Sequence, residues 1–539
     1  MPAHETFDYV VIGAGSAGAV IAHRLSEDPT LTVLLLEAGP AAEAMEISMP
    51  AAFPNLFRTK WDWQYSTTAQ PGLGGKHAYW PRMKALGGCS SMNAMMYVRG
   101  ARADFDGWKR DFGAVGWGYE DVLPYFLRSE GNAHLGGRYH NADGPLHVET
   151  RRYTHETASA WVESARAAGL ATNDDFNGET QVGAGLYQAN CKGGRRWSTA
   201  SAFLGTEVMA RPNLSVRTGA LVTRVLLEQG RANGVAYLAD GAEHRVQTNA
   251  EVVLCGGAIN SPQLLMLSGI GPAAHLAEHG IDVVVDSPGV GSNLHDHPVT
   301  PMVWHTRGTT DVAVDHVNPG RLLQWQLTGR GPLSSNIGEA GGFMHTRSGL
   351  EGPDIQFIVA PTGFYDNGFR EARSPMVTTG VVLVDVESRG QLRLRGSDPR
   401  WRPEMDPAYF AERSDLDAVR AGMVQAREIA AQGPFAEFLQ RPMAPIDDAS
   451  LDAYIQQYTQ TLYHPVGTCA MGSGDGAVVD PQLRVRGVEG LRVADASVMP
   501  KVTRGNTNAP SIMIGEKAAD LLRGTQSIHS TTKSRETVR

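Results

Sequence analysis

The sequence predicts an α/β fold that begins with a dinucleotide-binding unit and is assembled from segments far apart in the chain. A glycine-rich turn, Gly13 to Gly18, follows a short apolar run and precedes an alanine-rich stretch. Related apolar runs that end in a glycine or an acid recur at 251–257 and 491–496. The chain has 539 residues, about three times the length of a typical domain, so two or three packed units are expected.

Composition excludes several classes of protein. The net charge is −9, and acidic and basic residues are interspersed, which argues against a nucleic-acid partner. The four cysteines (Cys89, Cys191, Cys255 and Cys469) form no C-x-x-C pair and lie close to no histidine in the sequence. We therefore assign no metal, no disulfide framework and no disulfide reductase activity.

We expect a cytoplasmic protein without an integral membrane segment. An apparent strand begins by Phe7, which leaves no room for a charged region followed by an apolar signal core. No stretch reaches about 18 uninterrupted apolar residues. Peripheral membrane association and the oligomeric state stay open, and the polar tail 524–539 is expected to be disordered.

The first forty residues have the pattern of a dinucleotide cradle. Phe7 to Ile12 is typical of a buried parallel strand and Ala19 to Leu25 of a helix. Glycines between them permit a tight turn and let backbone N–H groups approach a pyrophosphate at the positive end of the helix. The predicted cofactor-binding residues of this turn are Gly13, Gly15, Ser16, Ala17 and Gly18.

A second strand, Thr32 to Leu36, ends in Glu37-Ala38-Gly39, and we predict that Glu37 and Ala38 also bind the cofactor. Glu37 lies 19 positions after Gly18, where a carboxylate can accept hydrogen bonds from both ribose hydroxyls. The same carboxylate would repel a 2′-phosphate, which disfavours NADP. Signals spread from the start to the end of the chain favour a large cofactor clasped by an interleaved domain.

Four blocks resemble the glucose–methanol–choline (GMC) family of flavoprotein oxidoreductases, from residue 7 to about 523. They are the glycine turn, the segment 81–93, the segment 257–271 and a C-terminal pair of motifs at 463–468 and 505–510. Within the family the chain is most similar to the choline-dehydrogenase-like and bacterial alcohol dehydrogenase branch. The resemblance implies FAD in a Rossmann-like domain, interleaved with a substrate domain built on an antiparallel sheet covered by helices.

The expected division assigns 1–145, 211–300 and 456–523 to the FAD-binding domain and 146–210 and 301–455 to the substrate domain. In the middle of the chain, 387–395 alternates like a half-exposed strand. Residues 415–431 have the apolar spacing of an amphipathic helix.

The segment 86–94 is predicted to line the flavin, because its glycines permit close approach and its short polar side chains offer hydrogen bonds. Some family members attach the flavin covalently through a histidine at the position of Met92. A thioether does not form that bond, so we expect non-covalent FAD. The predicted binding residues here are Leu86, Gly87, Gly88, Ser90, Ser91, Asn93 and Ala94.

Oxidation of an alcohol by hydride transfer needs a base for the hydroxyl proton, and histidine is the best-matched side chain. Of 17 histidines, His464 is singled out by Pro465, which restricts its backbone, and by Gly467, which permits a turn close by. The family's general base falls on this motif. We therefore predict that His464 is the catalytic base.

The motif 505–510 precedes a predicted helix at 511–522 whose N-terminus would stabilise negative charge on the reduced flavin. Asn508 resembles the family's second catalytic residue, which hydrogen-bonds the alcohol oxygen beside the histidine. A helix-capping role for Asn508 is the alternative. The remaining predicted cofactor-binding residues are Val222 (in an expected strand 217–225 near the adenine), Asp495, Ala496, Asn506 and Thr507.

Glu339 has two interpretations: it attracts a cationic alcohol such as choline, or it pairs with a structural arginine. Trp61, Trp63 and Tyr65 fit an aromatic cation box or a strand packed on a core equally well. Choline specificity does not follow from these residues.

The function predicted is FAD-dependent oxidation of a primary alcohol, a CH–OH donor, to the aldehyde. Electrons pass from the flavin to O2 or another acceptor, and the sequence does not separate an oxidase from a dehydrogenase. The alternatives are a choline-specific dehydrogenase, a non-redox flavin enzyme of the same fold (a hydroxynitrile lyase or a photodecarboxylase) and a non-catalytic FAD-binding protein. Retention of both His464 and Asn508 favours the redox reaction.

Overall fold

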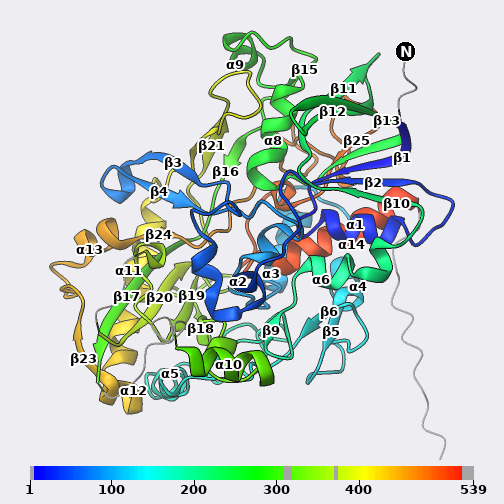
Figure 1. Ribbon diagram of the computed structural model, residues 1–539. Helices are drawn as coiled ribbons and strands as arrows, with labels where there is room; N and C mark the ends of the chain where they lie inside the picture. Colours follow the sequence, from blue (N-terminus) through cyan, green and yellow to red (C-terminus); the bar gives the residue numbers. More distant parts are fainter. Residues whose placement is uncertain (1–4, 308–317, 370–373, 525–539) are drawn as a thin grey trace, which may run out of the picture.

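The computed structural model describes residues 5–307, 318–369 and 374–524 and contains two large sheets (Figure 1). The expected disorder of the tail 525–539 falls outside the described residues. Sheet membership alternates along the chain, with one sheet at the upper right of Figure 1 and the other at the lower left. The fold class is thereby confirmed: an α/β cofactor unit is interleaved with a unit built on an antiparallel sheet.

The first sheet has a parallel centre and an antiparallel flank. Its order is β10 (Leu214–Arg217), β2 (Val33–Leu36), β1 (Glu5–Ile12), β13 (Ala242–Leu254), β12 (Arg231–Ala239) and β11 (Leu221–Glu228), and β25 (Leu491–Val493) also pairs with β13. The pairs β10–β2, β2–β1, β1–β13 and β13–β25 are parallel. The carboxyl ends of β1, β2, β13 and β25 therefore meet at one edge, where such sheets bind ligands.

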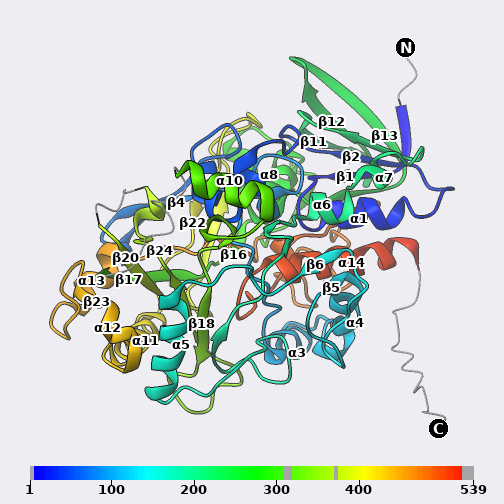
Figure 2. The same ribbon diagram turned by 60° about the horizontal axis from the view of Figure 1, so that its bottom comes forward.

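The helices of this unit follow the sequence patterns closely. Helix α1 (Gly18–Leu25) begins at the end of the glycine turn, and α14 (Asn508–Arg523) lies beside it (Figure 2). Helix α8 (Gly257–Leu267) follows β13 directly. The N-termini of α1, α8 and α14 thus come from the start, middle and end of the chain.

The second sheet is antiparallel throughout. Its order is β23 (Leu439–Pro442), β17 (Pro298–Thr306), β20 (Met376–Leu383), β19 (Ile355–Ala360), β18 (Ala340–Met344) and β7 (Gly183–Leu186), and β24 (Gln460–Thr461) also pairs with β17. Helices α5 (Glu156–Ala167) and α11 (Arg413–Ala430) pack on it. The five-segment division stays a proposal, and β24 lies in this sheet although 456–523 is assigned to the cofactor unit.

Two predicted strands differ from the structure. Residues 387–395 contribute only β21 (Gly390–Arg393), which pairs with β16 (Ser292–Leu294) and β22 (Glu404–Asp406) in a small separate sheet. Residues 217–225 are divided between β10 and β11, because Gly219 adopts a φ of +68° and turns the chain. The predicted amphipathic helix at 415–431 is confirmed as α11, with Val419, Met423 and Ile429 buried.

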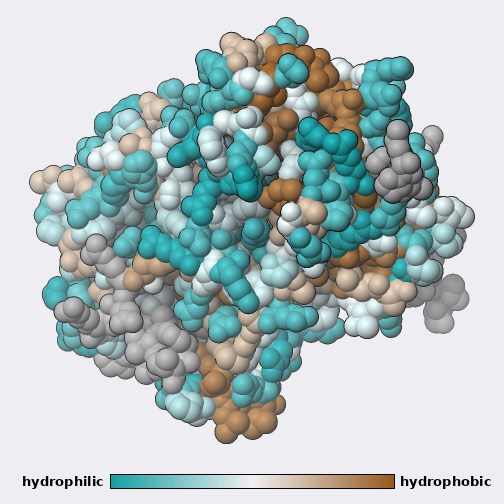
Figure 3. Space-filling view, turned by 45° about the horizontal axis from the view of Figure 1, so that its top comes forward, coloured by the Kyte–Doolittle hydropathy of each residue, from teal (hydrophilic) through white to brown (hydrophobic). Residues whose placement is uncertain are grey.

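The outer surface in Figure 3 is mainly hydrophilic, with apolar patches near its upper edge and at its lower tip. Among the described helices, we find none that has both the length and the apolar character needed to span a membrane. All four cysteines are free thiols.

Candidate functional site

One cavity is lined by residues of both sheets and has an empty volume of about 2360 Å³, part of it open to solvent. Because its lining extends from the glycine turn to strands of the antiparallel sheet, a dinucleotide and a substrate can share it. Sixteen predicted site residues line the cavity: Gly13, Gly15, Ser16, Ala17, Glu37, Ala38, Gly88, Asn93, Ala94, Val222, His464, Asp495, Ala496, Asn506, Thr507 and Asn508.

The glycine turn brings three chain segments together at backbone distance. Gly13 has a φ of +96°, and a Cβ there would lie 2.5 Å from the carbonyl oxygen of Cys255. A Cβ on Gly88 would lie 2.7 Å from the Cα of Gly15. Larger residues would therefore separate the turn from β13 and from the 86–94 loop. Gly18 does not line the cavity, since it starts α1 behind the turn.

Glu37 is held in place at the end of β2. Its carboxylate accepts hydrogen bonds from the backbone N–H of Ala14 (2.9 Å) and of Gly39 (2.8 Å). Burial raises the pKa of Glu37 to about 7, although these hydrogen bonds act in the opposite direction. Further donors, such as the ribose hydroxyls predicted to bind here, would favour the charged form.

Asp495 follows β25 and lies against the N-terminus of α8. It accepts hydrogen bonds from the backbone N–H of Gly257 (2.8 Å) and Ser497 (2.8 Å) and from the Ser261 hydroxyl (2.6 Å). These donors compensate for the burial of the carboxylate, which raises its pKa. Asp495 therefore organises the end of β25 beside the cavity.

In the 86–94 loop, four of the predicted residues lie outside the cavity lining. Leu86, Gly87, Ser90 and Ser91 do not line the cavity. The Ser90 hydroxyl donates to the carbonyl of Gly87 (2.6 Å) and that of Ser91 to the carbonyl of Leu86 (2.9 Å). Both serines therefore stabilise the loop that carries Gly88, Asn93 and Ala94, because their hydroxyls are used within it.

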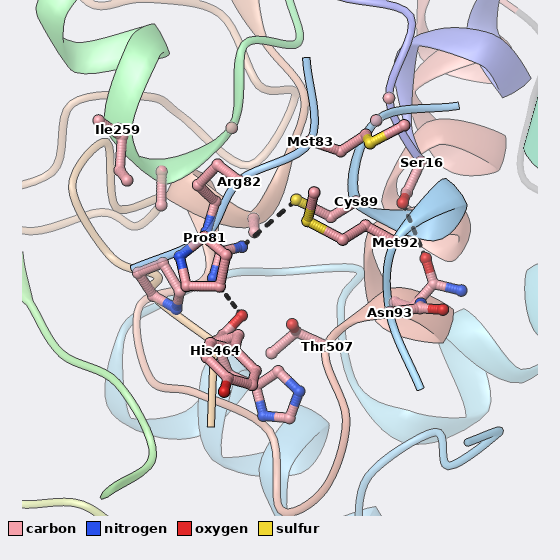
Figure 4. A pocket seen from close by; sticks show the side chains of 18 of the residues that line it. Ser16, Pro81, Arg82, Met83, Cys89, Met92, Asn93, Ile259, His464 and Thr507 are labelled. Atoms are coloured by element: carbon pink, nitrogen blue, oxygen red, sulfur yellow. Dashed lines mark hydrogen bonds between the residues drawn. The ribbon is translucent and has the colours of Figure 1, made fainter. Parts of the chain in front are cut away.

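The loop that carries His464 is fixed from two sides. The backbone N–H of His464 donates to Asp296 (2.6 Å), which also accepts hydrogen bonds from Tyr409 and Thr461. On the other side, the Arg82 guanidinium donates to the carbonyl of Tyr463 and to the Cys89 sulfur (Figure 4). Gly467 has a φ of +92°, as the predicted turn requires. The backbone that carries the imidazole is thus held in place.

His297 is a site residue that the sequence analysis missed. Its Nδ1 lies 3.0 Å from Nδ1 of His464, so one ring donates and the other accepts. Burial lowers the pKa of His297 to about 3, against an opposing contact with the Val384 backbone. Burial, the neighbouring His297 and the charge of Arg82 hold the pKa of His464 well below its usual value. Both rings are therefore neutral near pH 7.

The proton between the two rings decides which nitrogen of His464 is basic. The Nε2 of His297 is buried and has no hydrogen-bond partner among the described residues. When the Nδ1–H of His464 is the donor, Nδ1 of His297 accepts this hydrogen bond. The lone pair of His464 then lies on Nε2.

Asn506, and not Asn508, is the residue beside the His464 ring. The Asn506 Nδ2 lies 3.5 Å from His464 Nε2, and its Oδ1 is buried without a partner among the described residues. Asn508 instead accepts a hydrogen bond from the Ser16 hydroxyl (2.8 Å). The physical reason is that α14 begins at Asn508, three residues before the predicted start, so this side chain is in the first helical turn.

Glu339 does not line the cavity, so its predicted substrate role is replaced by a structural one. Its carboxylate accepts hydrogen bonds from the Ser335 hydroxyl (2.5 Å) and the His155 backbone (2.7 Å). The nearby charge of Arg151 also lowers the pKa of Glu339, which burial raises. In the described chain, Glu339 and Arg151 form no ion pair within 4.0 Å, so the pairing with an arginine stays a prediction.

His275, Glu278 and His279 form a cluster of potential metal ligands away from the cavity. The Nε2 of His275 accepts a hydrogen bond from the backbone N–H of Leu394 (2.9 Å), which uses the single lone pair of a neutral imidazole. His279 interacts with the carbonyl of the same residue (3.1 Å). We therefore assign this cluster to the anchoring of Leu394.

The residues that line the cavity fit an FAD molecule. A Cβ on Gly13 or Gly18 would clash with the backbone, the Glu37 carboxylate lines the cavity after β2, and the Asn506 Oδ1 lines it without a partner among the described residues. In the sequence, this site is indicated by glycines and acidic residues that recur at the ends of the predicted strands. The His295-Asp296-His297-Pro298 segment is a second signal, since it places Asp296 and His297 against His464.

Comparisons with known proteins agree with this geometry. Two family models described as GMC oxidoreductase match residues 7–299 and 386–515. The chain is 42% identical to a mitochondrial choline dehydrogenase of Mus musculus, over 96% of this chain and 90% of that protein. It is 40% identical to an alcohol dehydrogenase [acceptor] of Pseudomonas putida, over 96% and 95%. Among solved structures, pyridoxine 4-oxidase from Mesorbium loti superposes with a TM-score of 0.89 at 31% identity, covering 96% of this chain and 100% of that one.

Proposed function

The chain belongs to the GMC oxidoreductase family, and from this premise we propose that it oxidises a primary alcohol to the aldehyde with non-covalently bound FAD. The observation that supports the proposal best is the pair of nitrogens, His464 Nε2 and Asn506 Nδ2, 3.5 Å apart on the cavity wall. Two atoms at this separation can both contact one alcohol oxygen at hydrogen-bond distance. The oxygen would donate to His464 and accept from Asn506.

FAD, when bound, supplies the acceptor for the hydride that leaves the alcohol carbon. His464 takes the hydroxyl proton at Nε2, since its lone pair lies there when Nδ1–H points to His297. Asn506 orients the oxygen, and the positive charge of Arg82, which reaches the His464 environment, favours negative charge on that oxygen. Glu37 and the residues of the glycine turn bind the cofactor and take no part in the proton or hydride transfer.

The anaerobic holoprotein, mixed with a panel of primary alcohols, tests this proposal. We expect at least one alcohol to bleach the flavin absorbance, with the aldehyde recovered in equal amount. Parallel assays with O2 and with an artificial acceptor then identify the route of the electrons. A flavin that no alcohol bleaches would contradict the proposal and favour the non-redox alternatives.

We expect Asn506→Ala to slow anaerobic flavin reduction about fivefold at unchanged FAD content, because it removes one hydrogen bond to the alcohol oxygen. Asn508→Ala is the matched control two residues away. It should weaken FAD retention through the loss of the Ser16 contact and leave the reduction rate of loaded molecules nearly unchanged. A larger loss of rate in Asn508→Ala than in Asn506→Ala would show that Asn508, and not Asn506, hydrogen-bonds the alcohol oxygen.

We also expect acid precipitation to release the flavin into the supernatant. Met92 lines the cavity and offers no nitrogen that could bond to the flavin ring. Absorbance of the supernatant and the mass of the precipitated chain measure the outcome. A chain whose mass includes the flavin would show that another residue forms the covalent bond.

A further inference from the structure

We infer that the substrate end of the cavity selects a neutral, apolar alcohol and discriminates against choline and other quaternary ammonium alcohols. The inference rests on the proposed function and concerns the chemistry of the lining. This end is built by strands of the antiparallel sheet and by loops that pack against it. Its lining residues are Val299, Pro301, Ile358, Ala360, Thr378 and Gly380 from β17, β19 and β20, closed by the side chains of Phe53, Phe57, Met83, Met92, Ile337, Phe364 and Leu462.

No carboxylate from the described residues lies in this part of the lining. Glu37 and Asp495 are the carboxylates that line the cavity within the described chain, and both follow strands of the cofactor sheet. Asp495 is already bound by three donors. A quaternary ammonium has no hydrogen-bond donor, so its transfer into an apolar pocket is compensated only by negative charge or by aromatic faces.

The polar groups at this end offer no negative charge either. The Thr378 hydroxyl donates to the carbonyl of Thr362 (2.7 Å) and accepts from the N–H of Phe364 (2.9 Å). The Oε1 of Gln460 accepts from the backbone N–H of Asn367 (2.8 Å). These contacts are made within the wall, which leaves an apolar surface toward the substrate.

Arg82 contributes positive charge to the lining, and the nearby exposed Arg58 covers aromatic faces outside it. Arg82 lines the cavity beside Cys89 and the His464 loop (Figure 4), and no described carboxylate lies within ion-pair distance of it. Arg58 stacks its guanidinium 3.9 Å from the ring centroid of Phe369 and 4.9 Å from that of Tyr79. The carboxylate on this loop is Asp62, which does not line the cavity and accepts hydrogen bonds from the backbone N–H groups of Arg58, Gln64 and Arg82 and from the Tyr79 hydroxyl.

The aromatic residues do not form an open cation box. Phe57 contacts Phe53, Tyr463, Tyr79 and Phe369 through tilted or edge-to-face pairs, so these rings fill one another's faces. Trp63 stacks on Tyr65 at 5.9 Å, and the ammonium of Lys84 lies 4.6 Å from its ring centroid. The cations of the chain itself therefore already occupy aromatic faces near the cavity.

The sharpest test compares choline with 3,3-dimethylbutan-1-ol, which has the same shape but carries carbon in place of the charged nitrogen. Anaerobic stopped-flow reduction of the holoprotein reports Kd and the limiting rate separately for each. We expect the ratio of rate to Kd to favour the neutral alcohol at least about tenfold, chiefly through Kd. Equal ratios, or a preference for choline, would overturn the inference.

Other alcohols can bleach the flavin while neither of these two does. In that case, choline and 3,3-dimethylbutan-1-ol are each tested as competitors against a reactive alcohol. We again expect 3,3-dimethylbutan-1-ol to compete more tightly. Tighter competition by choline would overturn the inference in that case. If no alcohol at all bleaches the flavin, the proposed function fails, and the same pair compared by thermal shift of the holoprotein still decides the selectivity. Stronger stabilisation by choline would then count against it.

A pair of variants tests whether the lack of negative charge in the wall causes the preference for the neutral alcohol. Ile358→Glu places a carboxylate in the wall, and Ile358→Gln is the neutral control of the same shape. Because burial raises the pKa of a carboxylate, both are measured above pH ~8. We expect Ile358→Glu to shift the choline-to-neutral ratio toward choline at least about tenfold relative to Ile358→Gln. If FAD-loaded Ile358→Glu and Ile358→Gln have the same choline-to-neutral ratio, the charge of the wall does not set the preference.

Discussion

Substitution of His464 by alanine is expected to slow anaerobic flavin reduction at least ~10²-fold, the lower range for the loss of a general base. The FAD spectrum and the fold should persist, because the loop is held through the backbone of His464 and through Tyr463, not through the imidazole. Stopped-flow absorbance with a saturating alcohol measures the rate. The exposed His134 provides a control, since His134→Ala should leave the rate unchanged. A wild-type rate in His464→Ala would exclude the proposed base.

The pH profile gives a second readout for the same residue. Burial, His297 and Arg82 lower the pKa of His464 well below its usual value, so the neutral, proton-accepting form is the major one near pH 7 and above. The reduction rate should therefore be flat at and above neutral pH and decline only on acidification below about 6.5, the ordinary pKa of histidine. This decline should vanish in His464→Ala. A rate that still rises steeply from pH ~7 to ~9 would show that another group takes the proton.

The second large effect is expected at His297, which does not contact the alcohol in this mechanism but positions the proton of His464. His297→Ala removes the acceptor for Nδ1–H of His464, so this ring can take the tautomer with its proton on Nε2 and lose its basic nitrogen there. We expect the limiting reduction rate to fall at least about 20-fold, as wrong-tautomer variants of catalytic histidines do. Substrate Kd should change much less, which stopped-flow kinetics resolve.

His297→Asn separates this role from simple packing. The Asn Oδ1 can occupy the place of Nδ1 and accept the same hydrogen bond, so it should restore much of the rate that His297→Ala loses. FAD content and thermal stability provide the structural comparison. Equal rates in the two variants would indicate that the His297 ring acts through volume and not through its lone pair.

The framework of the cofactor unit could be predicted because it rests on local signals. The glycine turn, the strand before it and the helix after it follow each other within 21 residues, from Glu5 to Leu25, and each has its own pattern. The amphipathic helix α11 also follows from spacing alone, as its buried residues recur along one face. The 387–395 prediction was less successful, because alternation indicates a half-exposed strand but not the sheet that it joins. Here that sheet is small and separate.

The site was only partly accessible from the sequence. His464 could be found because Pro465 and Gly467 frame it in the sequence and because the motif resembles a family of known chemistry. Ser90 and Ser91 were assigned to the cofactor on side-chain type, but the loop itself uses their hydroxyls. Glu339 was placed near the substrate from its neighbours in the chain, but the carboxylate points to Ser335 and His155.

The sequence by itself determined the family, the cofactor cradle and the identity of the candidate base, since these depend on residue type and on short spacings. Only the tertiary structure decided which partners surround that base. Asn506 and Asn508 share one motif, and the start of α14 determines which of them lies beside His464. His297 lies 167 residues before His464, and the contact arises from the antiparallel pairing of β24 with β17, which has no local signature in the sequence. The direction of the proton between these rings, and with it the basic nitrogen, is therefore a property of the folded chain.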